Sequence, residues 1–167
     1  MNDSFLIRRA VREDAPTIFG FIQGIAAYEK MSDEVEGTAA DVERTLFDEH
    51  QAECIIGEEN GVPVGFALYF FNYSTFKTRH GLYLEDLFVN PEMRGKGYGK
   101  KLLLALTKIA KERGCGRMEW CCLDWNTPSI NFYKSLGARP MSEWTTYRLD
   151  EAQLDRLSAG VESPAGA

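Results

Sequence analysis

The sequence predicts an α/β fold in which helices flank a single mixed β-sheet. Strand-like and helix-like patterns alternate along the chain in the order βααβββαβαβ, which favours a sheet with both parallel and antiparallel neighbours. No internal repeat, linker or second apolar core interrupts this order. The chain has 167 residues, which is long enough to bury one full core.

Residues 5–9 favour a first strand, and the pattern that follows is helical. Asp14 is a typical N-cap residue, and Pro16 fits the first turn of a helix. Apolar side chains then recur at the spacing of a half-buried helix, at positions 18, 21, 22, 25 and 26. A loop over 29–37 is expected to lead to a second helix, which Thr38 caps and which ends near Phe47.

The middle of the chain predicts three strands. Residues 54–57 form the first of them, and Asn60-Gly61 is a typical two-residue hairpin turn. Residues 64–73 form a long apolar strand. Residues 82–89 are expected to pair with it.

A long helix is expected over 97–113, because apolar residues recur there at helical spacing, and Gly114 is a typical residue after a helix end. A strand at 118–123 follows. A short helix is expected over 127–136, with its end at Gly137.

Residues 145–149 favour a last strand that closes the sheet. We therefore expect one domain over residues 1–157. The remaining residues, 158–167, are small and polar, which predicts a disordered tail.

Composition narrows the function. The net charge of −6 argues against general binding to nucleic acid or to an anionic membrane, and it suits a cationic substrate. The four cysteines form no C-x-x-C pair, which predicts reduced core thiols in a cytoplasmic protein. The N-terminal residues lack an apolar signal segment, and no run reaches the length of a membrane span. His50 and His80 stand alone, so no metal site is predicted.

The loop at residues 94–99 has the chemistry of a phosphate site. Its three glycines allow positive φ and close approach of a ligand to the backbone. It opens a helix, whose N-terminal N–H groups and dipole favour an anion. The basic residues here are Arg94, Lys96, Lys100 and Lys101. The alternative is a flexible turn with a solvated basic rim.

Two common phosphate motifs fail here. A P-loop would need a glycine at Arg94 and a hydroxyl at Lys101, and a dinucleotide fingerprint would need a glycine at Lys100. The pattern [RQ]-x-x-G-x-[GA] fits, with Arg94, Gly97 and Gly99. This pattern is the coenzyme A pyrophosphate signature of the Gcn5-related N-acetyltransferase (GNAT) superfamily, which the chain resembles over residues 5 to about 150.

A narrower resemblance rests on four segments in order. They are Tyr28-Glu29-Lys30-Met31-Ser32-Asp33-Glu34-Val35, Tyr73-Ser74-Thr75-Phe76-Lys77, Leu82-Tyr83-Leu84-Glu85-Asp86, and Leu123-Asp124-Trp125-Asn126 leading into Asn131-Phe132-Tyr133-Lys134-Ser135-Leu136-Gly137-Ala138. Together they resemble the diamine acetyltransferases, the spermidine/spermine N1-acetyltransferase group, and are nearest its thialysine Nε-acetyltransferase branch. The resemblance implies the GNAT fold, a mostly antiparallel twisted sheet, and a homodimer.

Glu85 and Asp86 form the expected chemical centre. Two carboxylates inside an apolar strand are costly to bury, and burial raises a carboxylate pKa towards neutrality, which suits a base. Neighbouring strand residues point to opposite faces unless a bulge intervenes. The resemblance implies that Glu85 contacts the amine and helps to remove its proton, and that Asp86 helps to bind the amine. The alternative is a structural ion pair with Arg79 or Arg117.

Other positions are assigned by the resemblance. It implies that Tyr133 is the general acid for the coenzyme A thiolate, although a core tyrosine is the usual role at such a helix position. Asn126 and Asn131 are expected to contact the pantetheine arm. The alternative for Asn126 is that it only caps a helix.

The remaining assignments concern the amine and the coenzyme. The expected amine-binding residues are Tyr28, Glu29, Ser74, Thr75, Glu85 and Asp86. The expected coenzyme-binding residues are Leu87, Phe88, Val89, Arg94, Gly95, Lys96, Gly97, Tyr98, Gly99, Lys100, Asn126, Asn131 and Tyr133. An ordinary solvated acidic loop is the alternative for the segment around Tyr28 and Glu29.

The sequence therefore predicts an acetyl-CoA-dependent N-acetyltransferase that acts on a small cationic primary amine without a metal. The acetyl group would move directly in a ternary complex, with backbone N–H groups near 87–89 polarising its carbonyl. The alternatives are a non-catalytic acyl-CoA-binding regulatory module and a protein lysine or N-terminal acetyltransferase.

Overall fold

The computed structural model describes residues 4–166. The chain divides into two compact units, Met1–Cys121 and Cys122–Ala167. The outer ends of the predicted domain and tail, residues 1–3 and 167, lie outside the described residues. The bounds 1–157 and 158–167 stay predictions.

The first unit holds a five-stranded sheet in the order β1-β2-β3-β4-β5. Neighbouring strands are antiparallel, except for β4 and β5, which are parallel. The strands are β1 (Phe5–Arg9), β2 (Glu53–Glu59), β3 (Val62–Ser74), β4 (Arg79–Val89) and β5 (Met118–Trp120). The predicted single mixed sheet is confirmed.

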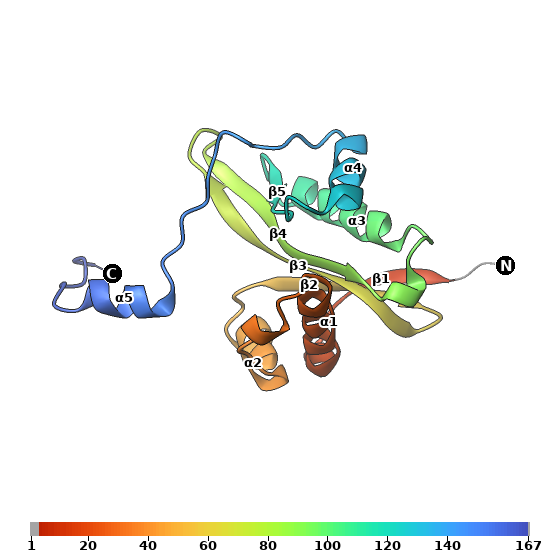
Figure 1. The fold of residues 1–167 in the computed structure, drawn as a ribbon, viewed down its shortest axis with the longest axis horizontal. Coiled ribbons are helices and arrows are strands. Elements are labelled where there is room, and N and C mark those ends of the chain that lie inside the picture. Colours follow the sequence, from red (N-terminus) through yellow and green to blue (C-terminus); the bar gives the residue numbers. More distant parts are fainter. Residues whose placement is uncertain (1–3, 167) are drawn as a thin grey trace. The chain divides into compact units, whose positions relative to one another are not determined.

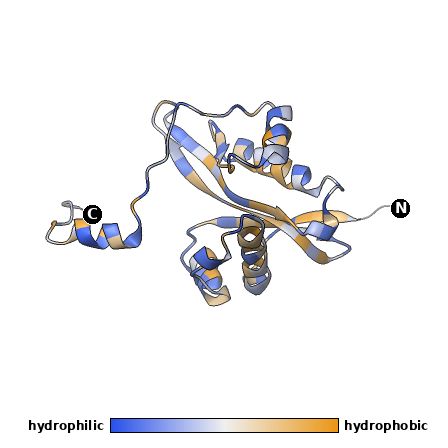
Figure 2. Cartoon of the chain, viewed as in Figure 1, coloured by the Kyte–Doolittle hydropathy of each residue, from blue (hydrophilic) through white to orange (hydrophobic). Residues whose placement is uncertain are grey.

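Helices cover both faces of this sheet. α1 (Ala15–Tyr28) and α2 (Ala39–Glu43) lie on one face, and α3 (Tyr98–Glu112) lies on the other (Figure 1). Hydrophobic residues recur along the strands, α1 and α3 (Figure 2). Short 3₁₀ turns at Arg12–Asp14, Ser32–Glu34 and Pro91–Met93 connect these elements.

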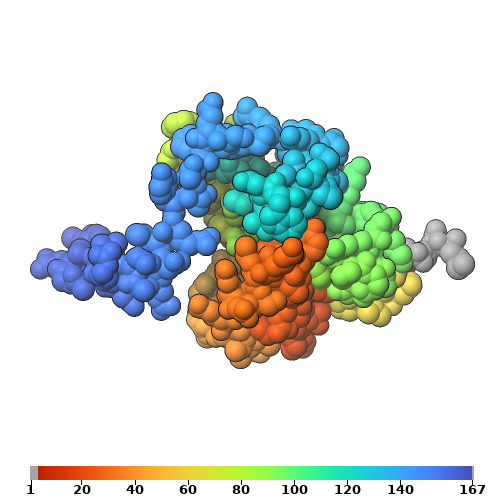
Figure 3. Space-filling view, in the orientation of Figure 1, coloured from red at the N-terminus to blue at the C-terminus, as the bar shows by residue number. Residues whose placement is uncertain are grey.

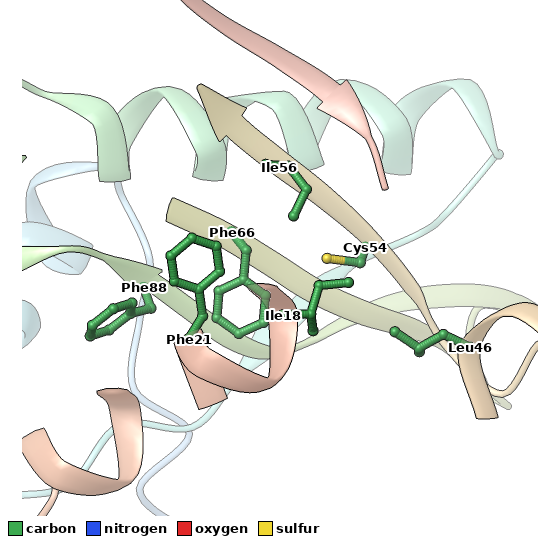
Figure 4. Packing of buried hydrophobic residues seen from close by; sticks show 7 residues of the cluster. All are labelled: Ile18, Phe21, Leu46, Cys54, Ile56, Phe66 and Phe88. Carbon is green, nitrogen blue, oxygen red and sulfur yellow. The ribbon is translucent and has the colours of Figure 1, made fainter. Parts of the chain in front are cut away.

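The core between α1 and the sheet ties that helix to β3 and β4. The ring of Phe21 stacks on Phe66, with centroids 5.3 Å apart, and lies 6.0 Å from the ring of Phe88. Burial of one such side chain contributes about 1.5–3 kcal/mol. Figure 4 shows the buried cluster, which consists of Ile18, Phe21, Leu46, Cys54, Ile56, Phe66 and Phe88.

Two tight turns follow their sequence signals. Asn60 and Gly61 have φ values of 52° and 80° and join β2 to β3 as the predicted hairpin. Gly114 follows α3 with φ of 73°. Few residue types adopt this left-handed conformation without strain. The two predicted turns are therefore confirmed.

The second predicted helix is only partly right. Thr38 caps α2 as predicted, because its Oγ1 accepts a hydrogen bond from the backbone N–H of Asp41 (3.2 Å). The α-helix then gives way to a π-helical turn at Arg44–Asp48. Thr45 Oγ1 donates to the carbonyl oxygen of Asp41 (2.7 Å), and such back-bonding distorts a helix.

Asp14 does not cap α1 through its side chain, which corrects the sequence prediction. Its carboxylate accepts two hydrogen bonds from the Arg8 guanidinium (2.7 and 2.9 Å) and one from the N–H of Val11 (2.8 Å). The bond from Arg8, together with that from Val11, holds the pKa of Asp14 below its ordinary value. Bidentate charge-assisted bonds are stronger than a neutral cap, which explains the choice of partner.

Replacing Asp14 with alanine is expected to lower the free energy of unfolding by about 2 kcal/mol near neutral pH, because a hydrogen bond to a charged group contributes about 1.5–3 kcal/mol. The folded-state pKa of Asp14 lies below the unfolded value. Its stabilisation is therefore complete above about pH 4 and is lost as the pH falls through the folded value. Chemical denaturation across this range measures the loss. Asp33→Ala, at an exposed turn, is the control, and equal losses for both variants would contradict the prediction.

The second unit contains α4 (Thr127–Ser135) and α5 (Glu151–Ser158). α4 matches the prediction and is followed by Gly137 at φ of 89°. The predicted strand at 145–149 is wrong, because these residues pair with no strand of the sheet and are exposed. α5 has no counterpart among the predicted elements, although the backbone N–H of Asp150 donates to Gln153 (3.0 Å) in a capping box.

The four cysteines are free thiols. Cys54 lies in the core, where burial raises the pKa of its thiol to about 12. Cys121 is exposed, so the prediction of a core thiol is right for Cys54 and wrong for Cys121.

Candidate active site

A β-bulge in β4 separates the surroundings of the two central carboxylates. Leu84 lies opposite Tyr69 on β3. Asp86 lies opposite Leu68, the neighbour of Tyr69, so Glu85 is an extra residue without a partner on β3. Because Leu68 and Tyr69 point to opposite faces of the sheet, Leu84 and Asp86 do so as well.

Beyond the bulge, alternate residues of β4 face the two helical layers. The ring of Phe88 meets Phe21 of α1. Leu87 faces α3, since a Cβ placed at Gly99 would lie 3.6 Å from a Leu87 methyl group. Asp86 is two residues from Phe88 and therefore points to the α1 side.

Asp86 is more buried than Glu85. Glu85 is exposed, whereas Asp86 is half-buried. Burial, followed by the negative charges of Glu85 and Glu29, raises the pKa of Asp86 to about 6. Burial also raises the pKa of Glu29, which directly follows α1. These three carboxylates, Glu29, Glu85 and Asp86, are called the acidic cluster below.

The alternative that Glu85 or Asp86 forms a structural ion pair with Arg79 or Arg117 is wrong. Within residues 4–166, neither Glu85 nor Asp86 has an ion-pair partner, and Arg117 pairs with Glu119 instead (3.0 Å). The acidic cluster therefore keeps its negative charge available to a cationic ligand.

β4 and β5 part beside the acidic cluster. Their pairing covers only Leu82 to Leu84 of β4, so no strand of the described chain borders the outer edge of β4 beyond the bulge. Asn90 N–H donates towards β3, to the carbonyl oxygen of Val64 (2.8 Å). By strand alternation the N–H groups of Leu87 and Val89 point to the open edge, where they suit an acetyl carbonyl oxygen.

The glycine-rich loop turns the chain from β4 into α3. Gly95 and Gly97 have φ values of 84° and 82°, and a Cβ at either position would meet no atom within 4 Å. The N–H of Lys101 donates to the carbonyl oxygen of Gly97 (3.1 Å), which is the first hydrogen bond of the regular helical pattern. The N–H groups of the preceding turn therefore have no acceptor within the helix. An open backbone surface at the positive end of a helix suits a phosphate.

Arg94 joins this loop to the acidic cluster. Its Nε donates to the carbonyl oxygen of Val89 (3.2 Å). Its guanidinium lies over the rings of Tyr28 and Phe88, 5.0 and 5.6 Å from their centroids. Because Tyr28 precedes Glu29, the predicted coenzyme and amine residues adjoin. Figure 3 shows the orange atoms after α1 next to the green atoms of this loop.

Two predicted coenzyme residues have partners on β2. Lys96 Nζ donates to Glu59 (2.8 Å), and the Tyr98 hydroxyl donates to the same carboxylate. Tyr98 is buried and stacks on Phe5, with ring centroids 4.0 Å apart. The Tyr98 side chain therefore anchors the start of α3. Its predicted contact with a coenzyme could be made only by its backbone.

Ser74 and Thr75 lie apart from the acidic cluster. Ser74 is buried, and its Oγ accepts a hydrogen bond from the N–H of Lys77 (3.2 Å) in the turn between β3 and β4. It lies opposite Arg79, which is about 20 Å from Glu85 along the strand. The structure therefore does not bring these two residues to the other predicted amine ligands.

The remaining predicted residues belong to the second unit. Tyr133 is half-buried on α4, with its ring 5.6 Å from that of Phe132. Asn126 caps α4, since its Oδ1 accepts a hydrogen bond from the N–H of Ser129 (3.4 Å). Asn131 is exposed. Their contacts with a coenzyme stay predictions.

The sequence model of the acetyltransferase (GNAT) family matches residues 8–138. The chain belongs to the GNAT family. The predicted recognition, fold and enzyme class are thereby confirmed, and the protein is an acetyltransferase.

Relatives of this GNAT protein agree with the narrower resemblance. It is 35% identical over 167 residues to thialysine N-epsilon-acetyltransferase of Sus scrofa, covering 93% of this chain and 98% of that protein. It is 37% identical over 163 residues to spermidine/spermine N(1)-acetyltransferase-like protein 1 of Homo sapiens, covering 91% of this chain and 23% of that protein. An integron cassette protein of V. cholerae has a similar structure, with a TM-score of 0.78, 29% identity, and coverage of 93% and 98% of the two chains.

Residues 4–166 contain neither a metal-binding cluster nor a membrane-spanning helix. No group of three or more His, Cys, Asp or Glu side chains is arranged to hold a metal ion. No helix in this part of the GNAT chain is both long and apolar enough to span a membrane.

Sequence reasoning missed Gly24, and it assigned Phe88 to the coenzyme rather than to the support of Arg94. A Cβ at Gly24 would lie 2.6 Å from Phe88 Cζ, so the glycine lets α1 approach the ring that lies under Arg94. A glycine in a helix interior is a usable signal, because it costs about 1 kcal/mol relative to alanine and implies a packing reason.

Proposed function

We propose that the protein transfers the acetyl group of acetyl-CoA to a primary amine of a small cationic substrate. A thialysine or lysine-like amine, a diamine and a polyamine all fit this class. The observation that carries the proposal is the contact of Arg94 with Tyr28 and Phe88, which places the phosphate-type loop beside the acidic cluster. A site for an anionic donor thus adjoins a site for a cationic acceptor.

The chemistry is direct attack in a ternary complex. A deprotonated amine attacks the thioester carbonyl carbon, and the N–H groups of Leu87 and Val89 stabilise the negative charge on the carbonyl oxygen. The C–S bond then breaks, and Tyr133 donates its phenolic proton to the departing thiolate. The attacking nitrogen loses its second proton as the amide forms, and that proton restores the phenol of Tyr133. A carboxylate of the pair Glu85 and Asp86 removes the amine proton. The residues of the loop, from Arg94 to Lys100, hold the pyrophosphate.

The acidic cluster favours substrates with more than one positive charge. Three neighbouring carboxylates stabilise an ammonium by Coulomb attraction. A simple monoamine would leave part of this negative charge unpaired. We therefore expect diamines and basic amino acids to react faster than monoamines of equal length.

An amine panel with acetyl-CoA tests the proposal. The panel contains thialysine, lysine, ornithine, diamines, spermidine, matched monoamines and lysine-containing peptides, and mass spectrometry identifies each acetylated product. Preferred acetylation of the small polycationic amines supports the proposal. Acetyl-CoA binding without transfer to any amine would indicate a regulatory acyl-CoA-binding module, and preferred acetylation of peptides would indicate a protein acetyltransferase.

The second unit supports the expected homodimer. Trp144 and Tyr147 are 75% and 92% exposed, and Leu149 is 55% exposed, in a stretch without regular structure. Side chains of this kind are enriched at protein interfaces and depleted on free surfaces. A second copy of the chain, covering residues 144–149, would remove this apolar surface from water.

Charge at this surface should dissociate the dimer. We expect the wild type to sediment as a dimer, and the double variant Trp144→Lys with Tyr147→Lys to sediment as a monomer at the same concentration. The control is Leu6→Lys on β1, where an apolar side chain is also exposed (60%). A monomeric wild type, or a dimer that survives in the double variant, would contradict the proposal.

A further inference from the structure

We propose that Asp86, rather than Glu85, takes the proton from the substrate ammonium. The inference rests on the proposed function and assigns one step within it. It differs from the role that the family resemblance implies, in which Glu85 removes the proton and Asp86 only binds the amine.

The bulge at Glu85 gives the two carboxylates different environments. It leaves Glu85 exposed and sends Asp86 to the α1 side of the sheet, opposite Leu68 and two residues before Phe88. The carboxylate of Glu85 is solvated by water, which stabilises its charge without help from a proton. The carboxylate of Asp86 has lost much of that hydration and therefore gains more from receiving a proton.

No group in the described part of the chain neutralises Asp86. Within residues 4–166 its carboxylate has neither a hydrogen-bond donor nor an ion-pair partner. Its oxygens are nevertheless not sealed from solvent, since the one fully buried side-chain atom without a partner in this range is Asn72 Oδ1. An acid that is half-buried, unpaired and still reachable is suited to meet an incoming ammonium.

The neighbouring charges that shift the pKa of Asp86 both favour its protonated form. The carboxylate of Glu29, directly after α1, acts on it, and from β4 the carboxylate of Glu85 does so. From β3, the residue opposite is the apolar Leu68. The same two carboxylates attract the ammonium to this position, so the proton donor and its acceptor are held together.

The proposed step is balanced in protons and electrons. An N–H bond of the ammonium breaks, an O–H bond forms on Asp86, and the electron pair stays on nitrogen as the nucleophile. After the attack on the thioester, Asp86 releases this proton to water. The exposed carboxylate of the neighbouring Glu85 can relay it. No metal, oxidant or reductant takes part in the step.

The test is the pH dependence of kcat/KM for the best amine of the panel. The wild type should lose activity as the pH falls through about 6, the pKa of Asp86. Asp86→Asn should reduce kcat/KM by about 10²–10⁴-fold near neutral pH. The variant should also lack the decrease in kcat/KM near pH 6, called the acidic limb below. Its kcat/KM should instead increase about tenfold per pH unit up to about pH 10.4, where the free amine loses its proton.

Two further variants identify the titrating group by its neighbours. Glu85→Gln and Glu29→Gln each remove a negative charge that raises the pKa of Asp86, so each should keep the acidic limb and move it to lower pH. Thermal melting and acetyl-CoA affinity of each variant check that the fold and the coenzyme site are intact.

The outcomes separate the two proposals. Loss of the acidic limb in Glu85→Gln, with its retention in Asp86→Asn, would overturn the role of Asp86 and return the proton to Glu85. Identical profiles in all four proteins would overturn it as well. A wild type that acetylates no amine of the panel would instead overturn the proposed function.

Discussion

Replacing Tyr133 with phenylalanine is expected to lower kcat by about 10²–10⁴-fold, the usual contribution of a general acid. Phenylalanine keeps the ring that packs beside Phe132 on α4 and removes only the hydroxyl. Without that proton donor, the thiolate of coenzyme A must leave as an anion or wait for a proton from water. The affinity for acetyl-CoA should change much less than kcat.

Steady-state kinetics with saturating amine, together with calorimetric titration of acetyl-CoA, measure the two quantities. Tyr73→Phe is the matched control, because it removes the same hydroxyl from an exposed residue of β3. If Tyr133→Phe keeps kcat while chemistry limits the rate, Tyr133 is a packing residue.

The elements that the sequence predicts correctly are those with strong local signals. The turn at Asn60-Gly61 and the helix end at Gly114 depend on residues that tolerate positive φ, and the stripe of α1 depends on apolar spacing alone. The backbone of the loop at residues 94–99 is of the same kind, since glycines between a strand and a helix specify it locally; its binding of a coenzyme stays a prediction. Arg94 was therefore found from sequence, although its contact with Tyr28 was not.

The features that sequence reasoning missed depend on contacts between distant segments. The bulge at Glu85 arises from the register between β3 and β4, and that register decides which carboxylate is buried. Asp14 has a good capping side chain, yet Arg8 on the neighbouring strand is the stronger partner. A strand at 145–149 has suitable residues, but strand propensity does not decide whether a segment pairs with the sheet, and these residues pair with none of its strands.

Replacing Gly97 with alanine is expected to weaken acetyl-CoA binding by about tenfold to a hundredfold. Gly97 has φ of 82° and directly precedes α3, and an added Cβ would meet no protein atom within 4 Å. The methyl group would instead occupy the space through which a pyrophosphate approaches the backbone. Loss of one charge-assisted hydrogen bond costs about 1.5–3 kcal/mol, and each 1.4 kcal/mol is about a factor of ten in affinity.

Backbone strain alone would also destabilise this variant, so the control must carry the same strain. Gly61 has φ of 80° and likewise has no atom within 4 Å of an added Cβ, but it lies in the hairpin between β2 and β3. Gly61→Ala and Gly97→Ala should both lose about 1–2 kcal/mol of stability, the cost of a left-handed non-glycine residue. Only Gly97→Ala should lose affinity for acetyl-CoA in calorimetric titration.

Arg94→Glu should also reduce the affinity at least tenfold, but it cannot replace the glycine pair as a test. Its guanidinium contacts Tyr28 and Phe88, so charge reversal would disturb the proposed amine site together with the proposed coenzyme site. A rise in amine KM in Arg94→Glu, without one in Gly97→Ala, would separate these two contributions. Equal acetyl-CoA affinity in Gly97→Ala, Gly61→Ala and the wild type would remove the coenzyme from this loop.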